Sequence, residues 1–190
     1  MNATSTLRYA GGLLVLVAAG VIVLVLLGTF DPQPTGELVW QADPVAVRIG
    51  SGEEQLLWQE TPRLNEILSV RLEAASNRMV DAAYGLAVGN EGYHLAVVVA
   101  PTGYVSIWQA RDREREMLLP WQTWPHVRQE GNELWVDVFA NKTRIWINRE
   151  LLWEGELARS PEMVGIFGQS SNGDVAIDVR RLELFQDAAE

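Results

Sequence analysis

Residues 133–157 read ELWVDVFANKTRIWINRELLWEGEL, and this stretch decides the fold of the chain. Three runs of β-branched and aromatic residues alternate with polar ones, and turn-forming residues separate the runs at 140–142 and 148–149. In the first two runs the alternation places four aliphatic side chains on one face: Val136, Val138, Ile145 and Ile147. A period of two across successive runs is typical of antiparallel hairpins. The stretch therefore predicts consecutive antiparallel strands with one buried face.

The chain on both sides of this stretch repeats the pattern. Further strands are expected at 37–41, 45–49, 55–58, 67–73, 84–88, 93–99, 104–109, 163–168 and 174–185, with turn residues between them. Arg180-Arg181 breaks the alternation of the last run and predicts a bulge. Residues 117–127 contain Pro120 and Pro125, and we expect an irregular loop there that covers a sheet edge. The regular spacing predicts an all-β antiparallel sandwich over residues 37–187.

The N-terminal segment differs from the rest because every residue from 10 to 27 is apolar or Gly. A helix of about 20 such residues spans roughly 30 Å of hydrocarbon, so residues 9–30 are predicted to be a single transmembrane α-helix. Residues 1–8 then form a short cytoplasmic N-terminus, and 31–36 form a linker that Pro32 and Pro34 stiffen. The prediction is a single-pass protein of the cell membrane with its domain outside the cytoplasm. A cleaved signal peptide is the alternative.

Composition excludes several function classes. The chain of 190 residues has a formal net charge of -10, which disfavours nucleic-acid binding because phosphate backbones are repelled. It has no Cys, so disulfides and thiolate metal sites are excluded, and a bacterial or archaeal cell surface is favoured. Neither a cofactor nor a metal site is predicted, with Ca²⁺ at the loops 90–91 or 172–174 as an alternative.

Several segments together resemble the concanavalin A-like lectin/glucanase superfamily. They are YGLAV (84–88), GYHLAVVVAPTGYVSIW (92–108), LLPWQTWPHVRQEGNELWVDVFANKTRIWINRELLWE (118–154) and MVGIFGQSSNGDVAIDVRRLELF (163–185). The order resembles most the branch of laminin-G-like and keto-disaccharide-hydrolase-type domains. The resemblance implies a jelly-roll sandwich. This chain has Asn148-Arg149 where the related hairpin has Asn-Gly, which is the favoured pair of a type I′ turn.

The resemblance does not extend to catalysis. Active glucanases of the superfamily carry a Glu-x-Asp-x-(x)-Glu strand, which this sequence lacks. Glu133 and Asp137 are four residues apart, so on one strand they are roughly 13 Å apart. A retaining glycosidase needs carboxyl groups about 5 Å apart. We therefore predict no catalytic residues and no enzyme activity, and a glycoside hydrolase is the least favoured function.

The same alternation that buries the aliphatic side chains turns a set of rings and polar groups to the other face. The residues predicted to bind a ligand or partner are Tyr104, Trp108, Trp135, Asp137, Phe139, Arg144 and Trp146. Such a face suits a protein partner, and it also suits a sugar, whose C–H face stacks on rings. The rings are instead structural if the 117–127 loop covers them or if they belong to the core. The preferred function is an interaction or accessory subunit of a membrane assembly, and a carbohydrate-binding surface domain is the alternative.

Overall fold

The computed structural model describes residues 16–24, 29, 31–112, 114–140, 142–156 and 159–187. The chain divides into two compact units, residues 1–33 and 34–190. In the first unit residues 16–24 form a helix, and much of the predicted membrane segment 9–30 lies outside the described residues. Within the described part of the chain, no helix has the length and apolar character needed to cross a membrane. The transmembrane anchor therefore stays a prediction.

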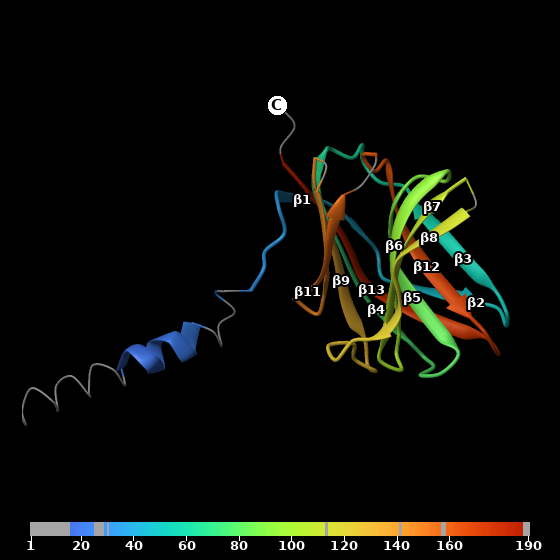
Figure 1. The fold of residues 1–190 in the computed structure, drawn as a ribbon, viewed down its shortest axis with the longest axis horizontal. Coiled ribbons are helices and arrows are strands. Elements are labelled where there is room, and N and C mark those ends of the chain that lie inside the picture. Colours follow the sequence, from blue (N-terminus) through green and yellow to red (C-terminus); the bar gives the residue numbers. More distant parts are fainter. Residues whose placement is uncertain are drawn as a thin grey trace, which may run out of the picture. The chain divides into compact units, whose positions relative to one another are not determined.

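The second unit is a sandwich of two antiparallel sheets (Figure 1). The seven-stranded sheet has the order β1-β13-β4-β9-β10-β11. On the same side of β13, β1 pairs with residues 182–186 and β2 pairs with residues 175–179. Its strands are β1 (Glu37–Ala42), β2 (Val45–Ile49), β4 (Ile67–Ser76), β9 (Asn132–Phe139), β10 (Lys142–Ile147), β11 (Glu150–Glu156) and β13 (Val175–Gln186). The six-stranded sheet has the order β3-β12-β5-β6-β7-β8. Its strands are β3 (Glu54–Gln59), β5 (Ala82–Gly89), β6 (Tyr93–Ala100), β7 (Tyr104–Arg111), β8 (Glu114–Thr123) and β12 (Met163–Ser170).

The core lies between the two sheets and is built by alternate residues of their strands. The aliphatic face predicted for the opening stretch is confirmed, because Val136, Val138, Ile145 and Ile147 are all buried in it. The opposite sheet contributes residues such as Leu86 from β5. The predicted all-β antiparallel sandwich is thus confirmed.

Two expectations about local structure have different outcomes. The bulge at Arg180-Arg181 is confirmed, since the pairing of β13 with β4 shifts register between Val179 and Arg181. The irregular loop at 117–127 is wrong over its first half, where β8 pairs with β7 as far as Thr123. Proline is tolerated in β8 because this strand is the edge of its sheet, where a missing N–H interrupts no second ladder.

Candidate functional site

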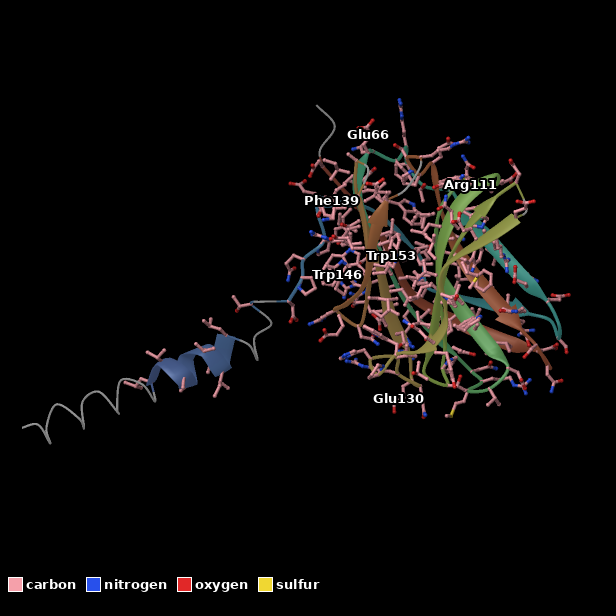
Figure 2. The ribbon with its side chains drawn as sticks, in the orientation of Figure 1. Glu66, Arg111, Glu130, Phe139, Trp146 and Trp153 are labelled. Atoms are coloured by element: carbon pink, nitrogen blue, oxygen red, sulfur yellow. The ribbon has the colours of Figure 1, made fainter. Side chains whose placement is uncertain are left out.

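The residues predicted as a ligand face on the seven-stranded sheet lie on neighbouring strands, but most of their polar groups are hydrogen-bonded or ion-paired within the sheet. Figure 2 shows Phe139 and Trp146 on the side of that sheet, away from the core. Ser69 Oγ donates to Asp137 Oδ1 at 2.5 Å, and Trp146 Nε1 donates to Asp137 Oδ2 at 2.9 Å. Burial raises the pKa of the Asp137 carboxyl, and these hydrogen bonds oppose the rise. Ser69 also accepts the Thr35 amide at 2.8 Å, so the end of the linker rests on this cluster.

The expectation of an open aromatic platform is wrong at Trp135. The ring lies on the outer face of the sheet, as predicted, but only 2% of the residue is exposed. Arg71 and Trp146 are its cross-strand neighbours on either side, and the two indole centroids lie 6.2 Å apart. A large flat side chain in the middle of a sheet is covered by such neighbours. Trp135 therefore cannot offer its ring to a ligand.

Arg144 is half-buried and is used within its own hairpin. Its Nε donates to Glu154 at 2.8 Å, and Lys142 Nζ lies 2.8 Å from the same carboxylate. The guanidinium carbon lies 5.6 Å from the centre of the Phe139 ring. The hydrogen bonds from the Lys142 and Arg144 side chains lower the pKa of Glu154, and the bond from Lys142 has the larger effect. The predicted set of polar residues on this sheet is thus largely self-satisfied.

Trp108 lies on the outer face of the other sheet and is also covered. It is 5% exposed, with the His94 and Phe167 rings packed edge-on at 5.3 and 5.7 Å. The Arg115 guanidinium lies 4.1 Å above the ring, a distance typical of a cation–π contact. Arg115 is fixed in turn by Glu54, with one hydrogen bond of 2.8 Å. Trp108 lies outside the cluster between the two sheets, as predicted, but it belongs to a second buried hydrophobic cluster with Ala87, Val98 and Phe167, so its ring is closed off.

Tyr104 is the predicted site residue that the structure leaves open. It is 44% exposed and lines a groove of about 330 Å³ together with Trp121, which is 46% exposed. The other lining residues are small or polar: Asp81, Ala82, Ala83, Ala100, Thr102, Gln169 and Ser171. Ser171 donates its amide to the Asp81 carbonyl at 2.9 Å and its hydroxyl to the Asp81 carboxylate at 3.2 Å. The groove therefore joins two exposed rings to a carboxylate, an amide and hydroxyl groups on a braced rim.

Sequence reasoning missed Trp121 as a groove residue. Pro120 and Pro125 on either side favoured a loop that covers a sheet edge, whereas Trp121 belongs to edge strand β8. The signal that could have found it is the position itself, because rings on an edge strand have a neighbouring strand on one side only. The structure brings Tyr104 together with Trp121, while Trp135, Asp137, Phe139, Arg144 and Trp146 lie on the other sheet.

The described residues offer little to a metal ion. Within them, no three His, Cys, Asp or Glu side chains come close enough together to hold one. At the loop 172–174, considered for Ca²⁺, the Arg78 guanidinium donates to the Asn172 carbonyl at 2.7 Å. A cationic side chain thus already uses an oxygen of that loop.

The fold is the concanavalin A-like jelly roll, as the sequence resemblance implied. A carbohydrate-binding module, CBM66 from Bacillus subtilis, superposes with a TM-score of 0.54 at 8% identity over 82% of this chain and 92% of that one. A Bacillus licheniformis beta-glucanase gives 0.59 at 6% identity over 75% and 78%. The Caenorhabditis elegans galectin LEC-6 gives 0.50 at 12% identity over 82% and 94%. No protein-family model and no curated protein matches the sequence.

Proposed function

We propose that this chain is a non-catalytic glycan-binding domain displayed at the outer surface of a membrane. The observation that carries the proposal is the groove of the six-stranded sheet, where Tyr104 and Trp121 are both exposed beside hydrogen-bonding side chains. Structural neighbours named as a carbohydrate-binding module and as a galectin make a sugar ligand consistent with the fold. They support the ligand class only.

The groove has the chemistry that a sugar requires. Apolar C–H faces of a pyranose pack on flat rings, and its hydroxyl groups need fixed donors and acceptors. Gln169 supplies an amide, and Asp81 supplies a carboxylate whose loop is braced by Ser171. At about 330 Å³ the groove is at the small end of ligand sites, so we expect it to hold a short segment of a saccharide.

The central strands of the same sheet support a non-catalytic role. Strands β5, β6, β7 and β12 read AAYGLAVG, YHLAVVVA, YVSIWQAR and MVGIFGQS, and these four strands contain no Asp or Glu. Glycoside hydrolysis generally requires two carboxyl groups on either side of the scissile bond. Along these strands, the outer face carries packed rings and small side chains in their place. Binding without hydrolysis is therefore the proposed activity.

The test is a glycan array probed with the full-length chain, held in a detergent that has no sugar headgroup. We expect binding to at least one polysaccharide class. Trp121→Ala should weaken that binding about tenfold, which corresponds to roughly 1.4 kcal/mol. Trp121→Phe, which keeps a ring, should retain most of it.

The matched control is Trp146→Ala on the other sheet. This change should leave glycan affinity unaltered, because Trp146 lies on the sheet opposite the groove and donates a hydrogen bond to Asp137. Loss of binding in Trp146→Ala but not in Trp121→Ala would move the site to the seven-stranded sheet and overturn the assignment. A folded protein that binds nothing on plant, algal and cell-wall arrays would also overturn it.

An accessory subunit of a membrane assembly is the second candidate. The observation that favours it is a set of exposed aliphatic side chains on β1 and β2, where Leu38, Val39 and Val45 are 50%, 44% and 45% exposed. Exposed apolar residues on sheet edges are typical of contact surfaces. Co-purification of another membrane protein in mild detergent, lost in Leu38→Glu, would support this role. Recovery of the chain solely as a monomer would count against it.

A further inference from the structure

Asp81 lies at the rim of the groove of the six-stranded sheet, in a backbone conformation that few side chains adopt. Its φ angle is 63°, in the left-handed region, which Asp and Asn tolerate better than other residues with a side chain. It directly precedes β5, and Ser171 directly follows β12, so the two residues continue the pairing that ends at Ala82 and Ser170. Residues held in this region are concentrated at functional sites. The chain thus keeps a carboxylate at a position where glycine would be free of strain.

Ser171 holds the Asp81 carboxylate by one of its two oxygens. The Ser171 amide donates to the Asp81 carbonyl at 2.9 Å, and the Ser171 hydroxyl donates to Asp81 Oδ1 at 3.2 Å. Among the described residues, none donates a hydrogen bond to Oδ2 or forms an ion pair with this carboxylate. Arg78 of the same loop donates instead to the Asn172 carbonyl at 2.7 Å. A braced carboxylate, which only accepts hydrogen bonds, can therefore receive a donor from a ligand.

The charge in the groove is negative. Asp81 is the one charged side chain among the described residues that line it, and the polar groups beside it belong to Thr102, Gln169 and Ser171. The chain as a whole carries a formal charge of -10. A carboxylate or sulfate on a ligand would therefore enter the groove next to a fixed negative charge and without a cation to pair with. Like charges a few ångströms apart repel strongly where water is partly excluded.

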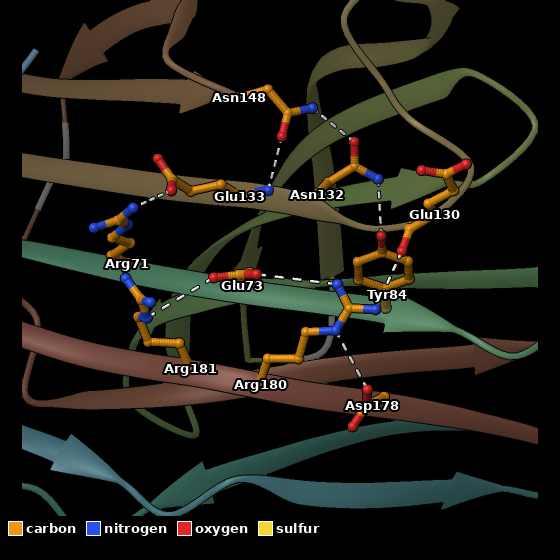
Figure 3. A network of polar contacts seen from close by, with 10 residues as sticks. All are labelled: Arg71, Glu73, Tyr84, Glu130, Asn132, Glu133, Asn148, Asp178, Arg180 and Arg181. Atoms are coloured by element: carbon orange, nitrogen blue, oxygen red, sulfur yellow. Dashed lines mark hydrogen bonds and ion pairs between the residues drawn. The ribbon is translucent and has the colours of Figure 1, made fainter. Parts of the chain in front are cut away.

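The polar cleft of about 640 Å³ at one end of the seven-stranded sheet contains arginines, but those of its floor are paired with carboxylates (Figure 3). Arg71 pairs with Glu133 and with Glu183, and Arg180 lies 3.4 Å from Asp178. These carboxylates offset the positive charge, so the cleft does not favour an acidic saccharide.

We propose that the groove of the six-stranded sheet selects uncharged saccharides over acidic ones and that Asp81 is its specificity-determining residue. The inference rests on the proposed glycan-binding function. A saccharide that packs on the ring of Tyr104 or Trp121 donates a hydroxyl hydrogen to the Asp81 carboxylate. A hydrogen bond to an ionised acceptor is about twice as strong as one between neutral groups. A uronate in the same place would present a second anion to Asp81, so repulsion would replace attraction.

A glycan array that pairs neutral oligosaccharides with their uronate and sulfated counterparts tests the selectivity, with the full-length chain in a detergent without sugar headgroups. In each pair that binds, we expect the neutral member to be preferred at least about tenfold. Asp81→Asn should weaken binding of the neutral member roughly fivefold and reduce its preference over the acidic member at least as much. Asn also tolerates a φ of 63° and keeps an acceptor for Ser171, so the melting temperature should stay level. A merely structural role for Asp81 would lower both affinities alike and leave their ratio unchanged.

Asp43→Asn is the matched control, since it makes the same change in net charge at an exposed residue between β1 and β2. It should leave both affinities unchanged. If it altered the ratio as much as Asp81→Asn, the selectivity would belong to the net charge of the chain, and the role of Asp81 would be overturned. Acidic members that bind as tightly as neutral ones, or an unaltered ratio in Asp81→Asn, would overturn the inference while the glycan-binding function stands. A folded chain that binds no glycan on the array would overturn that function itself.

Discussion

Replacing Trp108 by Ala should destabilise the domain rather than remove a binding surface. The indole is 5% exposed, and it contacts the rings of His94 and Phe167 and the guanidinium of Arg115. Truncating a buried Trp costs about 3–5 kcal/mol, and each aromatic pair contributes about 0.5–1.5 kcal/mol of that. Trp108 lies on an outer face under a single arginine cap, so we expect the low end, about 3 kcal/mol. For a domain of this size that lowers the melting temperature by roughly 6–12 °C.

Urea denaturation followed by far-UV circular dichroism measures this cost, with Trp121→Ala as the control. Trp121 is 46% exposed on an edge strand, so its removal should cost less than about 1 kcal/mol. The two tryptophans of this sheet should therefore have different effects when replaced. Trp108→Ala should lower stability, and Trp121→Ala should lower glycan affinity. A Trp108→Ala protein with wild-type stability and no glycan binding would refute the reasoning, because its ring would then be a ligand platform.

Three further predictions follow from close packing, side-chain hydrogen bonds and burial. Gly85→Ala should cost about 2–3 kcal/mol in urea melts, because its Cβ would lie 2.1 Å from the Val97 carbonyl oxygen, a backbone atom that cannot move aside. Asn148→Ala should cost about 2 kcal/mol, since it removes three side-chain hydrogen bonds and leaves Ala at a φ of 50°; Asn148→Gly should cost less. Burial lowers the pKa of His94, so its contribution to stability is present above the ordinary pKa and lost as pH falls through the lowered one. His94→Phe should therefore reduce the loss of stability between about pH 7 and pH 5, measured as the difference from wild type.

The strand layout was predictable from sequence because alternation and turn chemistry are local properties. Val136 and Ile145 pointed to the core, and the bulge at Arg180-Arg181 followed from a break in the period. Strand β8 was not predictable in the same way. Pro120 is a local signal against a strand, but its cost depends on whether a second strand pairs on that side, which is a property of the sheet order.

The candidate site was only partly predictable, since alternation reports the face of a residue but not what covers it. Trp108 and Trp135 are both outside the inner layer, as predicted, yet both are buried by residues of other strands. Arg115, which covers Trp108, belongs to the next strand, and Arg71, beside Trp135, is more than sixty residues away along the chain. Among the described residues, Tyr104 is the predicted ring that is exposed and lines the groove beside Trp121.

The position of a ring within its sheet explains which aromatic residues stay accessible. Trp108 lies between β6 and β8, and Trp135 lies between β4 and β10, so each has a strand on both sides. Tyr104 is the first residue of β7, and Trp121 lies near the end of edge strand β8, so neighbours cover less of each. The polar cleft of about 640 Å³, lined by Arg71, Asn132 and Asn148 among others, is likewise at a sheet end, where β4 and β9 meet the β10–β11 turn. In this chain, ligand sites should therefore be sought at strand ends and edges, because mid-sheet rings on the outer faces stabilise the sheets that carry them.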